Sequence, residues 1–245
     1  MDSQPFLPDL ETALREGELE MKGQFMLGSN YTFLVTVQYD GCEYPAVYKP
    51  SKGEQPLWDF PDNTLAKREV AAYFLSEALG FHFVPYTTLR DDGPFYGSGS
   101  LQQFIESDPE YHYFNFSDED KARLRPVVLF DLLVNNADRK GSHLLIERDT
   151  NKLWAIDHGL CFHEQEKLRT VLWDFAGERI PDPLLTCVAA LPGLLSPSAS
   201  LRLSLRPLLS PKEISALTTR AKSLVASGMF PMPPRDRRSF PYPPV

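Results

Sequence analysis

Two short polar segments hold the aspartates with the clearest chemical potential. Asp138 lies in residues 135–143, which read Asn-Asn-Ala-Asp-Arg-Lys-Gly-Ser-His, and Asp157 lies in residues 155–159, which read Ala-Ile-Asp-His-Gly. A hairpin predicted between the two segments could bring both carboxylates to one edge. One carboxylate can bind a divalent cation that neutralises phosphate charge, while the other accepts a hydroxyl proton. The pair therefore indicates phosphoryl transfer.

Two charged residues upstream complete an ordered set. Lys49 ends a predicted strand, and Glu69 lies one turn into the predicted helix that follows. Gly28 and Ser29 belong to a turn between the first two strands. A lysine on the third strand, a glutamate on the next helix, a catalytic-loop aspartate and an aspartate before a glycine occur in this order in kinases. The order of the four residues is a stronger signal than any of them alone.

In these residues the sequence resembles the atypical kinases related to phosphatidylinositol 3- and 4-kinases, in a short bacterial form. The resemblance covers about residues 20–180, and its most specific part is Asp138-Arg139 together with Asp157-x-Gly159. It implies ATP as the phosphoryl donor, with Mg²⁺ or Mn²⁺ as the metal. It also implies a bilobal, kinase-like α+β fold, with an antiparallel sheet and one main helix in the N-lobe and a reduced, mostly helical C-lobe.

The resemblance also implies a role for each matching residue. Lys49 would contact the α- and β-phosphates, and Glu69 would hold Lys49 in an ion pair. Asp138 would be the base or would orient the acceptor hydroxyl, and Asp157 would be the principal metal ligand. The other implied roles are a phosphate-binding turn at Gly28 and Ser29, neutralisation of the transferring phosphoryl group by Lys140, and an adenine-binding hinge near Gln103 and Glu106.

The catalytic motif departs from the family pattern Asp-Arg-His-x-x-Asn at two positions. Lys140 replaces the histidine, and His143 replaces the asparagine that normally holds a metal. Because imidazole suits softer ions than Mg²⁺ prefers, His143 as a metal ligand predicts tolerance of Mn²⁺. His158 replaces the phenylalanine of the family's Asp-Phe-Gly motif, and we expect it to change the packing below Asp157.

Periodicity and turn residues predict the elements that would position these side chains. β-branched and aromatic runs bounded by Gly, Asn and Asp predict an antiparallel meander in the first fifty residues. Capping residues and 3.6-residue periodicity predict the helices. The predicted strands are 23–26, 31–37, 44–49, 83–89, 95–106, 143–147 and 153–156, and the predicted helices include 8–17, 65–79, one or two after Ser117, and one from Pro211 to Gly228.

Composition places the chain among globular proteins and excludes several functions. Hydrophobic residues make up 42% and charged residues 24% of the 245 residues, so wholesale disorder and coiled coil are excluded. A formal charge of −8 argues against nucleic acid as a partner. Three cysteines far apart in sequence indicate neither a disulfide framework nor a thiolate zinc site. With no apolar run of 18 residues and no signal peptide, we expect a soluble, cytoplasmic protein without integral membrane association.

We expect an N-lobe at 1–104, a C-lobe at 105–230 and a basic, extended, proline-rich segment at 231–245. Twelve of the 22 prolines lie in residues 181–245, where we expect short helices and extended turns. From Leu205 onward there are seven basic and two acidic residues. A strap across an otherwise acidic lobe is the reading that we favour for the last fifteen residues.

The leading hypothesis is an ATP- and divalent-metal-dependent phosphotransferase acting on an unidentified protein or small molecule. A pseudokinase that binds nucleotide without transferring phosphate is an alternative, because His143 and His158 depart from the family motifs. A nucleotidyl transferase on a kinase-like fold is another. A phosphatidylinositol kinase is disfavoured, because only Lys167, Arg169 and Arg179 offer positive charge in the segment expected to meet the substrate.

Overall fold

The structure is a computed structural model that describes residues 9–25 and 30–245. Its residues group into two compact units, and each is described by itself. The first comprises Met1–Val70 and Pro85–Phe104, and the second comprises Ala71–Val84 and Ile105–Val245. Helix α2 (Leu65–Ala78) contributes its first turns to the first unit and its remaining turns to the second.

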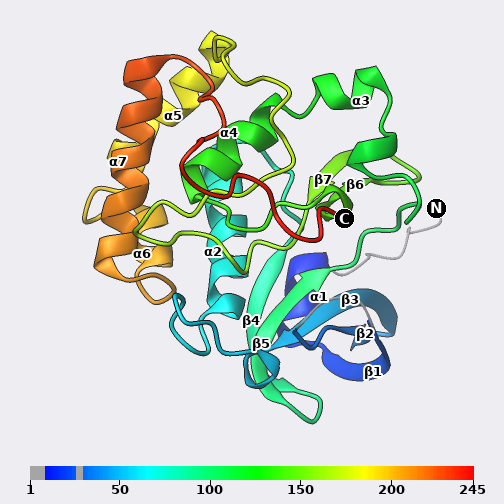
Figure 1. Ribbon diagram of the computed structural model, residues 1–245. Helices are drawn as coiled ribbons and strands as arrows, with labels where there is room; N and C mark the ends of the chain where they lie inside the picture. The colour runs from blue at the N-terminus through cyan, green and yellow to red at the C-terminus, as the bar shows by residue number, and fades with distance from the viewer. Residues whose placement is uncertain (1–8, 26–29) are drawn as a thin grey trace, which may run out of the picture. The chain divides into compact units, whose positions relative to one another are not determined.

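A five-stranded antiparallel sheet forms most of the first unit (Figure 1). The strand order is β1-β2-β3-β5-β4, so the predicted meander holds for the first three strands, and β5 then pairs with β3. The elements of this unit are α1 (Leu10–Glu16), β1 (Glu18–Gln24), β2 (Phe33–Tyr39), β3 (Cys42–Pro50), η1 (Ser51–Gly53), β4 (Thr87–Gly93) and β5 (Gly97–Gln103).

Alternation along β3 decides which side chains enter the core of this unit. Ala46 and Tyr48 are fully buried, in a cluster with Phe33, Val35 and Leu101. Successive side chains of a strand point to opposite faces, so Lys49 lies on the face opposite Tyr48. Gly99 of β5 faces this part of β3, and a Cβ atom there would lie 2.5 Å from the carbonyl oxygen of Lys49. The close approach of the two strands therefore requires glycine.

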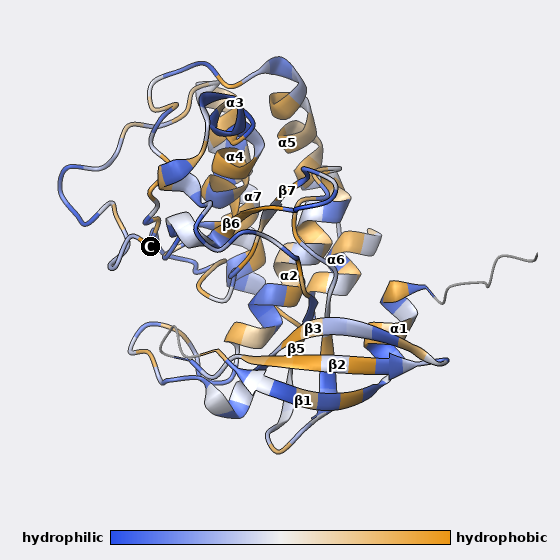
Figure 2. Ribbon diagram, turned by 90° about the vertical axis from the view of Figure 1, so that its right-hand side faces the viewer, coloured by the Kyte–Doolittle hydropathy of each residue, from blue (hydrophilic) through white to orange (hydrophobic). Residues whose placement is uncertain are grey.

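Helices and a short hairpin make up the second unit, and apolar residues dominate its helices α4 (Arg125–Val134) and α5 (Asp182–Leu194) (Figure 2). Ser210 and Glu213 form the predicted capping box of helix α7 (Pro211–Ser227), and Gly228 ends the helix in the left-handed conformation. The elements are η2 (Tyr113–Asn115), α3 (Asp118–Ala122), α4 (Arg125–Val134), η3 (Gly141–His143), β6 (Leu144–Ile146), β7 (Leu153–Ala155), α5 (Asp182–Leu194), α6 (Ser200–Leu205) and α7 (Pro211–Ser227).

Two elements differ from the sequence-based expectation. Strand β1 begins at Glu18, ahead of the predicted 23–26, because its alternating charged and apolar residues pair with β2. Helix α5 has 13 residues in a region where short helices and extended turns were expected. Pro183 lies in the first turn, where its missing N–H would have no intrahelical acceptor, whereas Pro192 lies inside the helix and removes one backbone hydrogen bond. Within the described residues, no helix is both long and apolar enough to span a bilayer.

Candidate functional site

The first unit brings Lys49 and Glu69 together, as the sequence predicted. The Nζ atom of Lys49 lies 2.5 Å from Oε1 of Glu69. The Glu69 side chain is only 3% exposed and that of Lys49 is 22% exposed, so the ammonium group retains access to solvent. Lys49 is the penultimate residue of β3, and Glu69 lies in the second turn of α2. A lysine fixed in this way presents one ammonium group for a phosphate.

The second unit places Asp138 in a loop that begins where α4 ends. Asn135 is in the left-handed conformation at the helix C-terminus, which favours asparagine among non-glycine residues. Its side chain donates to the carbonyls of His163 and Gln165 and accepts from the Lys167 amide. The side-chain oxygen of Asn136 then accepts from the backbone N–H of Asp138 at 2.9 Å. The loop backbone is therefore fixed by its own asparagines.

Burial and three charged neighbours set the charge on Asp138. Burial raises its pKa from the ordinary 3.8 to about 6, and the carboxylate of Asp157 also raises it, while Lys140 and Arg169 oppose the shift. Nζ of Lys140 lies 3.7 Å from Oδ2 of Asp138. Asp138 is thus ionised at neutral pH yet has a raised proton affinity, which suits a group that accepts a proton from a hydroxyl.

His143 and Asp157 form another pair of side chains in this unit. Nε2 of His143 lies 3.1 Å from Oδ2 of Asp157, and Nδ1 of His143 accepts from the Lys140 amide at 3.4 Å. Asp157 has a φ of +60°, a left-handed conformation that is unusual for a side chain other than Asn, Asp or Gly. Its side chain is 45% exposed, so the carboxylate is accessible to solvent.

The donor set at this pair suits a divalent cation that also binds phosphate. Among the described residues, no group of three or more His, Cys, Asp or Glu side chains is arranged to hold a metal ion. Mg²⁺ characteristically binds one or two protein carboxylates and takes its remaining ligands from phosphate and water, and Mn²⁺ also accepts imidazole. Asp157 fits such a partial shell, and nucleotide phosphates would complete it. His143 could join through Nε2 only in the tautomer that carries its proton on Nδ1, which gives up the contacts with the Lys140 amide and with Asp157.

Sequence reasoning missed the buried scaffold below these residues. Arg139, read from sequence as one part of a motif, is fully buried. Its guanidinium forms a bidentate salt bridge with Asp131 of α4, with hydrogen bonds of 2.8 and 3.0 Å. It also donates to Nε2 of His158 at 2.8 Å and to the carbonyl of Ile156 at 2.7 Å. One side chain therefore joins α4, the Asp138 loop and the Asp157 segment.

His158, which stands where the family motif has phenylalanine, is part of this scaffold. It is fully buried and packs edge-on against Phe130, with ring centroids 5.6 Å apart. Because a guanidinium has no acceptor, Nε2 of His158 must accept its hydrogen bond from Arg139, so the ring is neutral there. The sequence did hold one signal of this network, because Asp131 interrupts the apolar run of α4.

The remaining predicted residues are placed as follows. Gln103 ends β5, and its backbone N–H donates to the carbonyl of Tyr86 at 2.9 Å. Glu106 belongs to the second unit, where its exposed side chain pairs with Arg148 at 3.0 Å and its carbonyl accepts from the Arg148 amide. Their role as an adenine hinge stays a prediction. Gly28 and Ser29 lie outside the described residues.

A family model described as phosphatidylinositol 3- and 4-kinase matches residues 63–189, about half of the chain. Protein Rv2133c of Mycobacterium tuberculosis is 38% identical over 270 residues, which covers 96% of this chain and 95% of that protein. Phosphatidylinositol 4-kinase gamma 4 of Arabidopsis thaliana is 30% identical over 131 residues. That match covers 44% of this chain and 23% of the plant enzyme.

Two solved structures are similar in fold. Fam20 of hydra, solved with sugar, has a TM-score of 0.57 at 16% identity and covers 93% of this chain and 90% of its own. The proinflammatory kinase CtkA of Helicobacter pylori has a TM-score of 0.54 at 12% identity, with 88% and 94% covered. These likenesses confirm the predicted kinase-like α+β fold.

Proposed function

Because the chain belongs to the phosphatidylinositol 3- and 4-kinase family, we propose that it is an ATP- and divalent-metal-dependent phosphotransferase whose acceptor is a protein or small molecule. The observation that carries the proposal is the pairing in the second unit. Asp138 lies beside Lys140, and Asp157 lies beside His143, with all four residues on segments joined by Arg139. A proton acceptor and a partial metal shell thus share one rigid support.

The chain's own residues divide the chemistry between them. Asp138 accepts the proton of the acceptor hydroxyl as that oxygen bonds to the γ-phosphorus and the bond to the β,γ-bridging oxygen breaks, releasing ADP. Lys140 keeps the Asp138 carboxylate ionised and offers positive charge to the transferring group. Lys49, held by Glu69, binds phosphate oxygens of the nucleotide. Asp157 and His143 would hold a metal ion, which when bound supplies charge neutralisation for the phosphates.

The basic residues after the metal motif favour an acceptor other than a phosphoinositide. Lipid kinases grip headgroup phosphates with cations in this segment, but here Arg169 donates to the carbonyl of Ala137 at 2.7 Å. Arg179 pairs with Asp182 at 3.0 Å. Glu164, Glu166, Asp174 and Glu178 add negative charge to the same segment. A polyanionic headgroup would meet cations already engaged and carboxylates that repel it.

Nucleotide binding tests the role of Lys49. We expect Lys49→Met to weaken ATP binding at least tenfold, about 1.4 kcal/mol, because the variant lacks the ammonium group that contacts phosphate. Lys52→Met is the matched control, because Lys52 is exposed three residues further along the chain. Titration calorimetry with a non-hydrolysable ATP analogue measures both. Equal affinity of Lys49→Met and wild type would remove Lys49 from the site.

The loss of the ammonium group also leaves Glu69 without that partner in a buried position, so Lys49→Met alone is expected to be less stable. Adding Glu69→Gln removes the buried charge and should recover most of the unfolding midpoint without recovering ATP affinity. This double variant separates the binding role of the lysine from its role in packing.

Metal binding tests the pair His143 and Asp157. We expect Asp157→Asn to weaken binding of Mn²⁺ with ATP at least tenfold, measured by electron paramagnetic resonance of free Mn²⁺. Asparagine tolerates the left-handed conformation of Asp157, so the backbone is retained. Asp149→Asn, in the exposed turn between β6 and β7, is the control. We expect His143→Asn to shift the preference from Mn²⁺ toward Mg²⁺, and an unchanged preference would exclude His143 as a ligand.

A further inference from the structure

The proline-rich segment, residues 231–245, supplies hydrogen-bond acceptors to the Asp138 loop and to the chain after the metal motif. The carbonyl of Pro244 accepts from the Gly141 amide at 2.8 Å. The carbonyl of Ser239 accepts from the Thr170 amide at 3.0 Å and from Nε1 of Trp173 at 3.3 Å. In Figure 1 this segment, in red, runs past α4 toward the hairpin β6–β7. All these residues belong to the second unit.

The three donors lie where an acceptor of the proposed transfer must approach. Gly141 directly follows Lys140 and is three residues from Asp138. Arg139 forms a parallel bridge with Thr170, which aligns the Asp138 loop with residues 169–171. Gly141 and Thr170 are buried, so their N–H groups need protein acceptors. A Cβ atom on Gly141 would lie 2.8 Å from the Phe114 ring, so there is no space for a side chain at this position.

The proline-rich segment packs on this place through alternate residues. Ser239 and Pro241 are buried, whereas Phe240 is 51% and Tyr242 is 80% exposed. The chain before them folds back, because Oγ of Ser239 donates to the carbonyl of Pro234 at 2.8 Å. The contacts with Gly141, Thr170 and Trp173 are made by main-chain carbonyls. Recognition through main-chain atoms with few side-chain anchors is typical of grooves that accept extended peptides of varied sequence.

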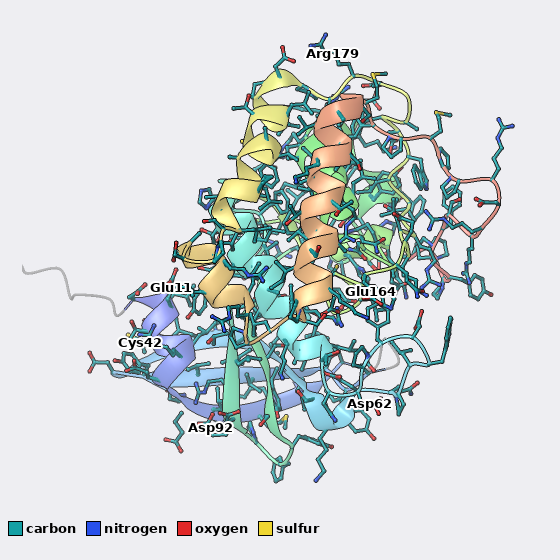
Figure 3. The ribbon with its side chains drawn as sticks, turned by 90° about the vertical axis from the view of Figure 1, so that its left-hand side faces the viewer. Glu11, Cys42, Asp62, Asp92, Glu164 and Arg179 are labelled. Atoms are coloured by element: carbon teal, nitrogen blue, oxygen red, sulfur yellow. The ribbon has the colours of Figure 1, made fainter. Side chains whose placement is uncertain are left out.

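Charge adds a preference for basic peptides. Arg237 pairs with Glu166 at 3.2 Å, where the two side chains are 34% and 53% exposed. Glu164, labelled in Figure 3 near the first turn of α7, lies 3.9 Å from Lys212. Glu166 therefore offers a carboxylate to a basic residue located two positions before the buried Ser239.

We propose that Gly141, Thr170 and Trp173 line a peptide-binding groove, that the proline-rich segment fills it in cis, and that the acceptor is consequently a polypeptide with a basic residue. The identity of this acceptor rests on the proposed phosphotransferase activity. In the transfer, a serine, threonine or tyrosine oxygen of the peptide bonds to the γ-phosphorus, ADP leaves, and the hydroxyl proton passes to Asp138. The segment thereby holds the protein in an inhibited state until it is displaced.

Full-length variants test the groove without requiring activity. Pro241→Asp puts a charge at the buried anchor, and Phe240→Asp makes the same change at the neighbouring exposed position. We expect a fluorescein-labelled synthetic peptide of residues 231–245 to bind Pro241→Asp at least tenfold more tightly than wild type, because the intramolecular segment no longer competes. Phe240→Asp should match wild type. Amide exchange in residues 139–143 should quicken at least tenfold in Pro241→Asp and slow again when the peptide is added.

A second variant, Glu166→Arg, keeps the groove testable if Pro241→Asp does not fold. In Glu166→Arg the attraction to Arg237 becomes repulsion, so we expect faster exchange at Thr170 and tighter binding of a peptide in which Arg237 is replaced by Glu. Equal peptide binding by wild type, Pro241→Asp and Glu166→Arg would overturn the groove. So would faster exchange in the variants that the added peptide fails to slow.

Transfer assays separate this inference from the proposed function. With γ-labelled ATP and a random mixture of peptides, Pro241→Asp should label peptides at least fivefold faster than wild type, and the 231–245 peptide should inhibit competitively. If ATP is consumed and glycerol or free amino acids are labelled while peptides are not, the polypeptide acceptor is wrong and the phosphotransferase stands. If no variant consumes ATP but the peptide binds Pro241→Asp selectively, the groove is supported and the proposed function fails.

Discussion

We expect Asp138→Asn to abolish phosphoryl transfer, by at least a thousandfold, while making the nucleotide-free protein more stable at neutral pH. The amide cannot take up the hydroxyl proton, so loss of general-base assistance and of the charge that orients the acceptor both lower the rate. The same change removes a carboxylate whose charge the folded protein disfavours. Nucleotide binding should be retained, because Lys49 is unaltered.

The sign of the stability effect follows from the raised pKa of Asp138. Below pH 3.8 the carboxyl is protonated in both the folded and the unfolded protein and contributes nothing. Between 3.8 and about 6 the folded protein holds the proton that the unfolded chain has released, so stability falls as pH rises. Above about 6 the loss is complete. With its side chain 30% exposed, solvent screening leaves a cost of about 1–2 kcal/mol.

Thermal unfolding from pH 4 to pH 8 measures this difference directly. The unfolding midpoints of wild type and Asp138→Asn should coincide near pH 4 and separate through pH 6, with the variant several degrees higher at pH 7.5. Asp149→Asn, in an exposed turn, controls for loss of one negative charge and should follow wild type. A variant less stable than wild type at pH 7.5 would mean that Lys140 stabilises the carboxylate more than burial destabilises it.

The second large effect is expected from Arg139→Met, which should destabilise the protein by about 3–5 kcal/mol. The substitution leaves Asp131, 2% exposed, as an uncompensated buried carboxylate. It also removes the hydrogen bonds from Arg139 to His158 and to the carbonyl of Ile156. Because the last two partners flank Asp157, we expect transfer activity to fall together with stability. Chemical denaturation gives the free energy of unfolding.

An exposed ion pair in the same unit provides the matched control. Arg179 and Asp182 are joined at 3.0 Å, and their side chains are 75% and 76% exposed, so Arg179→Met should cost less than about 1 kcal/mol. Combining Arg139→Met with Asp131→Leu replaces the buried pair by apolar groups and should recover part of the loss. If Arg139→Met unfolds at the wild-type denaturant concentration, Arg139 does not hold the loop and the metal segment together.

Local chemistry was enough to predict several elements of the fold. Ser210 with Glu213 specified the start of α7, and Gly228 specified its end, because both signals act within one helical turn. Such capping signals need no knowledge of distant contacts, which is why sequence alone carries them. The pairing of Lys49 with Glu69, by contrast, was expected from the resemblance to kinases.

Features that depend on distant packing could not be predicted in this way. Arg139 in an Asp-Arg-Lys sequence resembles a solvated turn, and only the packing of α4 on the loop places its guanidinium beside Asp131. The sequence likewise did not indicate the left-handed conformation of Asp157 or the geometry of its pairing with His143. Docking of the proline-rich segment on Gly141 depends on a sequence separation of about a hundred residues, for which neither composition nor charge gave a register.

The most direct test of phosphoryl transfer compares ATP labelled at the γ-phosphorus with ATP labelled at the α-phosphorus. The full-length protein is incubated with each nucleotide, Mg²⁺ or Mn²⁺, and a mixture of peptides and small hydroxyl compounds, beside Asp138→Asn as the control. We predict that label reaches an acceptor from the γ position alone, with ADP released in equal amount, and that Asp138→Asn transfers none. Label arriving from the α position, or no transfer with either metal despite nucleotide binding, would contradict the account.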